Sequence, residues 1–313
     1  MSERGATTGS VRIAIGQFVP EPRTVAVNTM RTLSLVDEVR GQADWLVLPE
    51  LFLTGYQVTD VRDIALPGAS QLIATIVDRT RGAGIGLQVG FAEKADDAVY
   101  DSALIVTPAG EVSIYRKTHL FGDEPKAFAA GADLPVIPAG AATVAPLICY
   151  DLEFPEPARL AASRGAGIIL VSTANMEPYA EQQVLFARTR ALENRCFVAV
   201  ANRVGEESGF TFCGNSIVAD PMGRVLVQAN DSEEVMLIAE CDLSVLSKSR
   251  QHGDYLADRR TDLCPVMDGA GEPWIARTRV PRESYAGALE GVCGADSDEI
   301  ADYLRGERES WDE

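Results

Sequence analysis

Three residues of this 313-residue chain could together cleave a polar covalent bond: Glu50, Lys117 and Cys149. Each follows a short apolar run that is typical of a buried strand. A thiol can attack an electrophilic carbon, a carboxylate can remove the thiol proton, and an ammonium can hold the negative charge that develops on oxygen. Because strands of α/β folds end at common edges where sites form, we expect these side chains to meet. The set favours nucleophilic catalysis by cysteine.

The elements that must position these residues alternate between strand and helix patterns, with hairpin turns such as the one at residues 220–223. The pattern indicates an α/β fold with mixed sheets, because apolar strands need helices on both faces of the protein. Helices are predicted over residues 25–39, 69–81 and 179–195, and strands over 11–18, 45–48, 85–92, 100–107, 112–115, 143–149, 167–172, 196–201, 214–219, 224–227 and 235–241.

Cys149 is expected at a strand-to-helix junction, because residues 153–160 place prolines and acids where the first turn of a helix tolerates them. A thiol buried beside a cation at such a position is expected to shift toward the reactive thiolate. A competing interpretation is a Cys-His hydrolase that uses His119. This histidine lies two residues beyond Lys117 and would face the same side of a strand. Taken singly, each residue also has an ordinary explanation as a solvated charge or a core cysteine.

The charge balance argues against several functions. Acidic residues outnumber basic ones 46 to 28, and the resulting formal charge of −18 repels phosphate backbones and anionic lipid surfaces. Residues 1–12 lack the apolar core of a secretory signal, and prolines interrupt the weakly polar stretch 134–150. We therefore expect a cytoplasmic protein that binds neither nucleic acid nor membranes.

Metal and disulfide chemistry are also disfavoured by the sequence. The cysteines at 149, 196, 213, 241, 264 and 293 are never closer than 17 residues, so no CxxC pair exists. The chain has only two histidines, which nearly excludes a multi-histidine metal site. The chemistry must come mainly from carboxylates, lysine or one special thiol.

Three stretches resemble the signature blocks of the nitrilase superfamily of carbon-nitrogen hydrolases, and they occur in the family's order. They are Leu48-Pro-Glu50-Leu-Phe-Leu-Thr-Gly-Tyr56, Tyr115-Arg-Lys117-Thr-His-Leu-Phe121 and Leu147-Ile-Cys149-Tyr-Asp-Leu-Glu-Phe-Pro-Glu156. Two further stretches agree, Glu124-Pro-Lys-Ala-Phe128-Ala-Ala-Gly131 and Asp254-Tyr-Leu-Ala-Asp-Arg-Arg260. Five matched blocks are more specific than any single motif.

The resemblance covers about residues 11–265 and implies a four-layer αββα sandwich with two mixed sheets, no metal and no organic cofactor. It also implies pairing into a homodimer or a higher homo-oligomer. By the same match Cys149 is the nucleophile, Glu50 the general base and Lys117 the cationic stabiliser. Glu124 is the second carboxylate, which positions substrate or supports proton transfer. We expect a catalytic domain over residues 8–265 and an acidic C-terminal extension over residues 266–313.

Four residues are expected to bind substrate: Tyr56, Tyr150, Glu153 and Asn175. Tyr150-Asp151 after the nucleophile is similar to the amidase and carbamoylase branch rather than to true nitrilases. Many relatives carry arginine at the position of Glu153, so a carboxylate there favours a substrate that bears an amine or a guanidine. Glu153 could equally be a first-turn acid that pairs with the helix dipole.

The expected function is hydrolysis of a small carboxamide by water, through a Cys149 thioester, to an acid and ammonia. An N-carbamoyl amine hydrolase or a nitrilase would use the same Glu-Lys-Cys set. An acyltransferase would pass the same thioester to an amine, and a catalytically silent binding module would keep only the fold.

Overall fold

Two mixed β-sheets form the centre of the computed structural model, which describes residues 9–56, 59–251 and 253–259. The first sheet has the strand order β15-β1-β2-β4-β5-β6, with β3 paired to β4 at one end. Its strands are β1 (Ser10–Gln17), β2 (Trp45–Val47), β3 (Leu66–Pro67), β4 (Gly86–Ala95), β5 (Ala98–Val106), β6 (Val112–Arg116) and β15 (Val235–Asp242).

The second sheet has the order β14-β13-β10-β9-β8-β7, and a small ribbon of β11 and β12 lies beside it. These strands are β7 (Ile137–Ala139), β8 (Ala142–Ile148), β9 (Ile168–Ser172), β10 (Phe197–Ala201), β11 (Val204–Glu207), β12 (Phe210–Cys213), β13 (Ile217–Ala219) and β14 (Val225–Gln228). Both sheets combine parallel and antiparallel pairs, as the sequence predicted.

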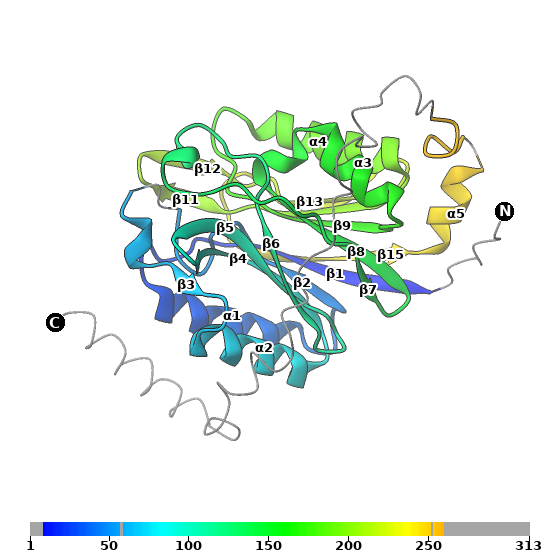
Figure 1. The fold of residues 1–313 in the computed structure, drawn as a ribbon. Coiled ribbons are helices and arrows are strands. Elements are labelled where there is room, and N and C mark those ends of the chain that lie inside the picture. The colour runs from blue at the N-terminus through cyan, green and yellow to red at the C-terminus, as the bar shows by residue number, and fades with distance from the viewer. Residues whose placement is uncertain (1–8, 57–58, 252, 260–313) are drawn as a thin grey trace.

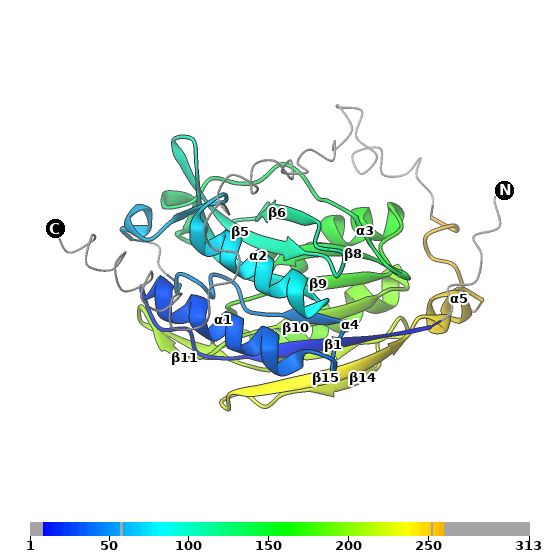
Figure 2. The same ribbon diagram turned by 90° about the horizontal axis from the view of Figure 1, so that it is seen from below.

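Helices cover the outer face of each sheet, which gives four layers (Figure 1). Helices α1 (Val25–Val39) and α2 (Gln71–Ala83) pack side by side under the first sheet, as both views show (Figure 2). Helices α3 (Pro155–Ser163) and α4 (Ala180–Asn194) cover the second sheet, and the short α5 (Ser244–Arg250) follows β15. The predicted αββα sandwich is confirmed.

The alternation of side chains along each strand divides the core into two clusters. In β1, Ile13 and Ile15 point into the layer between the sheets, whereas Ala14 faces the helices. In β2, Trp45 points between the sheets and Leu46 faces the helices. Because both faces of the first sheet are covered, its strands read as continuous apolar runs.

The strand directions bring the ends of β2 and β6 to one edge of the first sheet. Strand β2 pairs in parallel with β4, and two successive antiparallel pairings through β5 turn β6 into the same direction. In the second sheet β8 and β9 are parallel, so their carboxyl ends also meet. The segments that follow these four strands build the candidate site.

A buried polar link joins the two sheets next to that edge. Gln88 in β4 donates from Nε2 to the Leu170 carbonyl at 3.2 Å and to Ser172 Oγ at 3.1 Å. Ser172 Oγ in turn donates to the carbonyl oxygen of Leu48 at 2.8 Å. Both side chains are fully buried, so these bonds fix the relative position of the sheets.

The structure differs from the sequence prediction at element boundaries, and it adds elements that were not predicted, namely strands β3, β7, β11 and β12 and helix α5. Helices α1, α2 and α4 agree with the predicted ranges to within two residues. Cys149 begins a 3-10 turn, η3 (Cys149–Leu152), and the α-helix starts only at Pro155. Residues 260–313 lie outside the described residues, and with them the predicted domain boundary, the acidic extension, Cys264 and Cys293. Among the helices that the structure describes, none is both long and apolar enough to cross a bilayer.

The Ser172→Ala substitution is expected to lower the free energy of unfolding by about 1–3 kcal/mol, because it removes the hydroxyl donor to the buried Leu48 carbonyl and one of the acceptors of the Gln88 amide. Urea unfolding would measure the loss. Ser163→Ala is the matched control, since that exposed hydroxyl also donates to a backbone carbonyl. Equal effects of the two substitutions would contradict the role given to the buried link.

Candidate active site

The Lys117 ammonium is the centre of the site. Lys117 follows β6 directly, and its Nζ lies 2.5 Å from Glu50 Oε1 and 2.8 Å from Glu124. A third carboxylate, that of Asp101 in β5, is 3.4 Å away. All four side chains are buried, so solvent screens these charges weakly. The arrangement gathers residues from three distant parts of the chain around one cation.

Glu50 is held in a tight turn after β2 and Pro49. Its second oxygen, Oε2, accepts the Ala174 N–H at 2.7 Å from the segment after β9. The turn packs directly on Gly90 of β4, where an added Cβ would lie 2.6 Å from the Glu50 Cα. A side chain at position 90 would displace Glu50, so the glycine is required by this close approach.

Glu124 opens a short 3-10 turn, η2 (Glu124–Lys126), and is fixed by three donors. In addition to the Lys117 ammonium, the Tyr56 hydroxyl donates to Oε1 at 2.8 Å and the Phe121 N–H donates to Oε2 at 2.8 Å. Tyr56, one of the predicted substrate-binding residues, thus contacts a carboxylate of the site. Burial next to that carboxylate raises the pKa of Tyr56 far above its ordinary value, so the hydroxyl keeps its proton.

Cys149 lies at the start of η3 with a φ of +42°, in the left-handed region that non-glycine residues rarely adopt. The residue retains some exposed surface, in contrast to Glu50, Lys117 and Glu124. Burial of the thiol raises its pKa well above the usual value, and repulsion by Glu50 adds to this while Lys117 opposes it. The expected shift toward thiolate is therefore wrong in direction, because burial of the thiol and the two neighbouring carboxylates outweigh the one ammonium.

The protonation of Lys117 follows from the same charges. Burial on its own lowers the pKa of the ammonium, but the combined attraction of the surrounding acidic groups, Glu50 and Glu124 foremost, raises that pKa well above the usual value. Lys117 is consequently a permanent cation, which suits it to hold an oxyanion and not to act as a base.

Asp151, which the sequence indicated only as a marker of the amidase branch, links the Lys117 segment to the turn that begins at Cys149. Its carboxylate accepts the Tyr115 hydroxyl and the Thr118 hydroxyl, both at 2.7 Å, and the backbone N–H of Ile148 at 3.2 Å. His119 belongs to this cluster, since its Nδ1 lies 2.9 Å from Asp151 Oδ1. The His119 imidazole stacks on Phe154. The pKa of the Cys149 thiol is shifted by a different set of charged groups, namely Glu50, Lys117 and Glu124.

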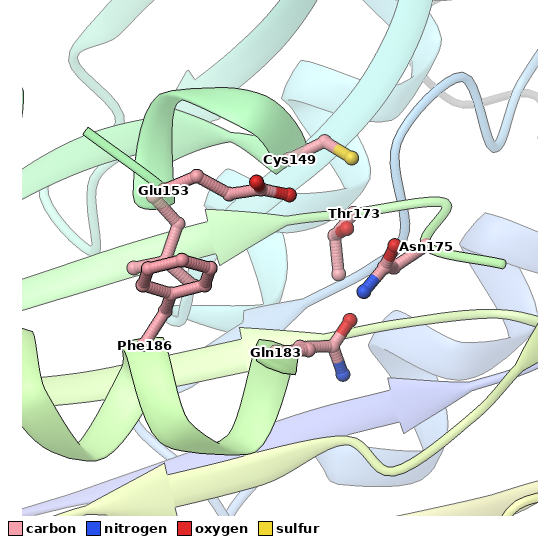
Figure 3. A pocket seen from close by; sticks show the side chains of 7 residues that line it. Cys149, Glu153, Thr173, Asn175, Gln183 and Phe186 are labelled. Atoms are coloured by element: carbon pink, nitrogen blue, oxygen red, sulfur yellow. The ribbon is translucent and has the colours of Figure 1, made fainter. Parts of the chain in front are cut away.

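A small pocket opens beside Cys149 (Figure 3). The carboxylate of Glu153 and the polar ends of Thr173, Asn175 and Gln183 line this pocket together with the Cys149 sulfur (Figure 3). Burial raises the pKa of Glu153 above its usual value. The lining residues are Cys149, Leu152, Glu153, Thr173, Asn175, Gln183 and Phe186.

The four residues predicted to bind substrate thus occupy different places. Glu153 and Asn175 line the pocket, and Asn175 is oriented by its Nδ2 donating to the Tyr179 carbonyl at 3.3 Å. Tyr56 and Tyr150 are not part of that lining among the described residues. Tyr150 packs edge to face against Phe121 and Phe154, while Tyr56 reaches Glu124.

Sequence analysis also missed Asp101 and Gln183. Asp101 gave one usable signal, because an acid stands inside an otherwise apolar strand whose residues are expected to be buried. Gln183 gave none, since a glutamine on a helix is ordinarily solvated. Its Nε2 donates to the Gly214 carbonyl at 3.1 Å, which directs the side chain inward.

The carboxylates of Glu50, Asp101 and Glu124 have oxygens within 4.8 Å of one another, a spacing that could also hold a metal ion. Lys117 already lies within 3.4 Å of all three, so its ammonium takes the place that such a cation would fill. The donor set therefore fits a lysine-centred acid-base site.

Residues 12–251 match the family model described as carbon-nitrogen hydrolase. The chain is 35% identical over 252 residues to an (R)-stereoselective amidase of Pseudomonas sp, which covers 80% of this chain and 92% of that protein. It is 30% identical over 277 residues to N-carbamoylputrescine amidase of Arabidopsis thaliana, which covers 78% of this chain and 92% of that protein.

One similar solved structure is the amidase from Nesterenkonia sp. AN1 with the acetamide moiety of fluoroacetamide added covalently at its active-site cysteine. The TM-score is 0.72 at 29% identity, and the match covers 84% of this chain and 97% of that one. The predicted resemblance to the nitrilase superfamily is confirmed, and the chain belongs to the carbon-nitrogen hydrolase family.

Proposed function

We propose that this protein hydrolyses a small carboxamide to a carboxylic acid and ammonia through a thioester on Cys149. The observation that carries the proposal is the partly exposed Cys149, which borders a pocket and lies within the electrostatic reach of Glu50, Lys117 and Glu124. The amidases among its relatives support the same reaction class.

The first half of the proposed reaction forms the thioester. Glu50 removes the Cys149 proton as the sulfur attacks the amide carbon, so that the thiolate forms only when substrate is present. The Lys117 ammonium and the Tyr150 backbone N–H hold the oxyanion of the tetrahedral intermediate. The carbon-nitrogen bond then breaks, and ammonia leaves with the proton that Glu50 returns.

The second half consumes water. A water molecule enters the space left by ammonia, Glu50 takes one of its protons, and the hydroxide attacks the thioester carbon. The carbon-sulfur bond breaks, the sulfur regains its proton from Glu50, and the acid departs. Glu124 keeps the Lys117 ammonium oriented through both halves by its 2.8 Å contact.

We further propose that the substrate carries an amine or a guanidine. Glu153 places a half-buried carboxylate in the pocket beside the nucleophile, and a substrate cation would satisfy it. The relative named N-carbamoylputrescine amidase acts, by its name, on a carbamoylated amine, which makes an N-carbamoyl amine the second candidate. Release of carbon dioxide together with ammonia would distinguish that substrate from a carboxamide.

The compartment and assembly are also proposals: a cytoplasmic homodimer or larger homo-oligomer. Free cysteines at 149, 196, 213 and 241 suit a reducing compartment. Exposed apolar side chains on α4 and β14, namely Leu185, Leu192, Val225 and Leu226, are the kind of surface that a second copy covers. Light scattering of the purified protein would measure the mass of the assembly.

The function is tested by ammonia release from a panel of small amides, nitriles and N-carbamoyl amines. Lys117→Ala is expected to lower kcat by about 10²–10³-fold, since one preorganised oxyanion donor contributes about 3 kcal/mol. Cys149→Ala is expected to abolish turnover. Lys126→Ala, an exposed lysine nearby, is the control and is expected to leave kcat unchanged. Full activity of Cys149→Ala would refute the proposal.

The charge of the substrate is tested with Glu153→Gln. This change is expected to lower kcat/KM for cationic amides by about tenfold or more, because it removes an attraction of about 1–4 kcal/mol, and to leave neutral amides unaffected. Glu156→Gln, an exposed acid in the first turn of α3, is the matched control. If cationic and neutral amides respond alike to Glu153→Gln, the charge preference is wrong.

The raised pKa of Cys149 predicts how the resting thiol reacts with methyl methanethiosulfonate. Because the thiolate is the reactive form, the labelling rate is expected to rise about tenfold per pH unit from about pH 7 to about pH 9. Glu50→Gln should lower the pH of half-maximal labelling, since it removes the stronger of the two carboxylate repulsions. Peptide mapping isolates the Cys149 signal, and a plateau already reached by about pH 7 would show a resting thiolate.

A further inference from the structure

Asp101 lies at the centre of the site, although the reaction above assigns it no step. It is in β5, and its backbone carbonyl accepts the Lys117 N–H at 2.8 Å. Its side chain is fully buried, with Oδ2 at 3.4 Å from the Lys117 ammonium. An acid in this position must affect the charge balance on which the nucleophile and its base depend.

The Asp101 carboxyl lacks the donors that its neighbours have. Glu50 accepts the Lys117 ammonium at 2.5 Å and the Ala174 N–H, and Glu124 accepts three donors. In the described part of the chain neither Asp101 oxygen accepts a hydrogen bond. A buried carboxylate without donors is strongly disfavoured, whereas a protonated carboxyl needs fewer of them and can donate one.

The charges of the cluster lead to the same conclusion. Three carboxyls within 4.8 Å of one another share one ammonium, so full ionisation would leave an excess of two negative charges in a buried site. Like charges at this range cannot all ionise, and one proton is retained. The proton belongs on the group with the fewest donors to its oxygens, which is Asp101.

We propose that Asp101 carries a proton at neutral pH and is a positioning residue that donates a hydrogen bond to Glu50. This inference rests on the proposed function for its catalytic meaning. The neutral acid leaves the Lys117 ammonium to Glu50 and Glu124, and it adds a third donor that orients the Glu50 carboxylate. Burial raises the pKa of Asp101 well above its usual value, and repulsion by the negative charge of Glu50 adds to the rise.

The charged groups that face Asp101 come from each segment packed against it: Glu50 after β2, Lys117 after β6 and Glu124 in η2. Loss of the Asp101 proton at alkaline pH would replace its hydrogen bond to Glu50 by repulsion and would draw the ammonium away from its partners. We therefore expect kcat to fall on the alkaline side as Asp101 ionises.

Stability measurements test the proton without any substrate. An acid whose native pKa is raised stabilises the fold below its unfolded pKa of about 3.8, and this stabilisation is lost as the pH rises toward the native pKa. Asp101→Asn has no such proton. The quantity to compare is the ratio of two unfolding equilibrium constants, that of the wild type over that of Asp101→Asn. This ratio should rise by up to about tenfold per pH unit from about pH 5 upward, which is equivalent to 1.36 kcal/mol per pH unit.

Activity measurements test the positioning role. The amide of Asp101→Asn can still donate to Glu50, so its kcat at neutral pH should stay within about threefold of the wild type, and the alkaline fall caused by Asp101 should disappear. Asp101→Ala removes the donor and should lower kcat by about tenfold or more with little change in KM. Asp220→Asn, a buried aspartate in the β13–β14 turn, controls for the substitution itself.

The outcomes separate the two proposals. A ratio of unfolding constants that does not change between about pH 5 and about pH 8 would overturn the inference, because Asp101 would then be ionised in the native protein. A loss of more than about a hundredfold in kcat for Asp101→Asn would also overturn it, since a neutral side chain would then be incompatible with the site. If the ratio of unfolding constants rises with pH but the protein hydrolyses no amide, the protonation of Asp101 is supported and the proposed function is refuted.

Discussion

Burial of one ammonium among three carboxyls is the constraint on which the rest of the site depends. Lys117 loses its hydration in the interior, where the carboxylates of Glu50 and Glu124 at 2.5 and 2.8 Å and the Asp101 carboxyl at 3.4 Å replace it. Those partners come from β5, from the turn after β2 and from η2, so the sheet must assemble before the cation is satisfied. Removing Lys117 would leave the buried carboxylates of Glu50 and Glu124 uncompensated, which couples the charge balance of this site to its folding.

The same cluster sets the reactivity of Cys149. A single cation beside a thiol favours the thiolate, but here burial of the thiol, together with two carboxylates beside the same cation, raises the pKa of Cys149. In the proposed reaction the thiol loses its proton to Glu50 only as the sulfur attacks the substrate carbon. Such a site resists random electrophiles, and the φ of +42° at Cys149 holds the sulfur at the mouth of the pocket.

Much of this could be predicted from the sequence because the decisive residues stand in distinctive local patterns. Glu50, Lys117 and Cys149 each follow an apolar strand, and the two-sheet architecture followed from strand and helix alternation. The expected shift of the thiol toward thiolate was wrong in direction, since the pKa of Cys149 depends on its burial and on the carboxylates that converge on it in the folded chain. Gln183 was missed because only the folded chain turns this ordinary polar residue inward, whereas Asp101 was overlooked although an acid inside an apolar strand is unusual.

The central claim is that the Cys149 sulfur carries the acyl group during turnover. Acid quenching of the enzyme while it hydrolyses an amide, followed by mass mapping of its peptides, tests this claim most directly. The account predicts the mass of the acyl group on the peptide that contains Cys149, and loss of that mass after treatment with hydroxylamine. Continued turnover with the acyl group on another residue, or with no covalent adduct at any time, would contradict it.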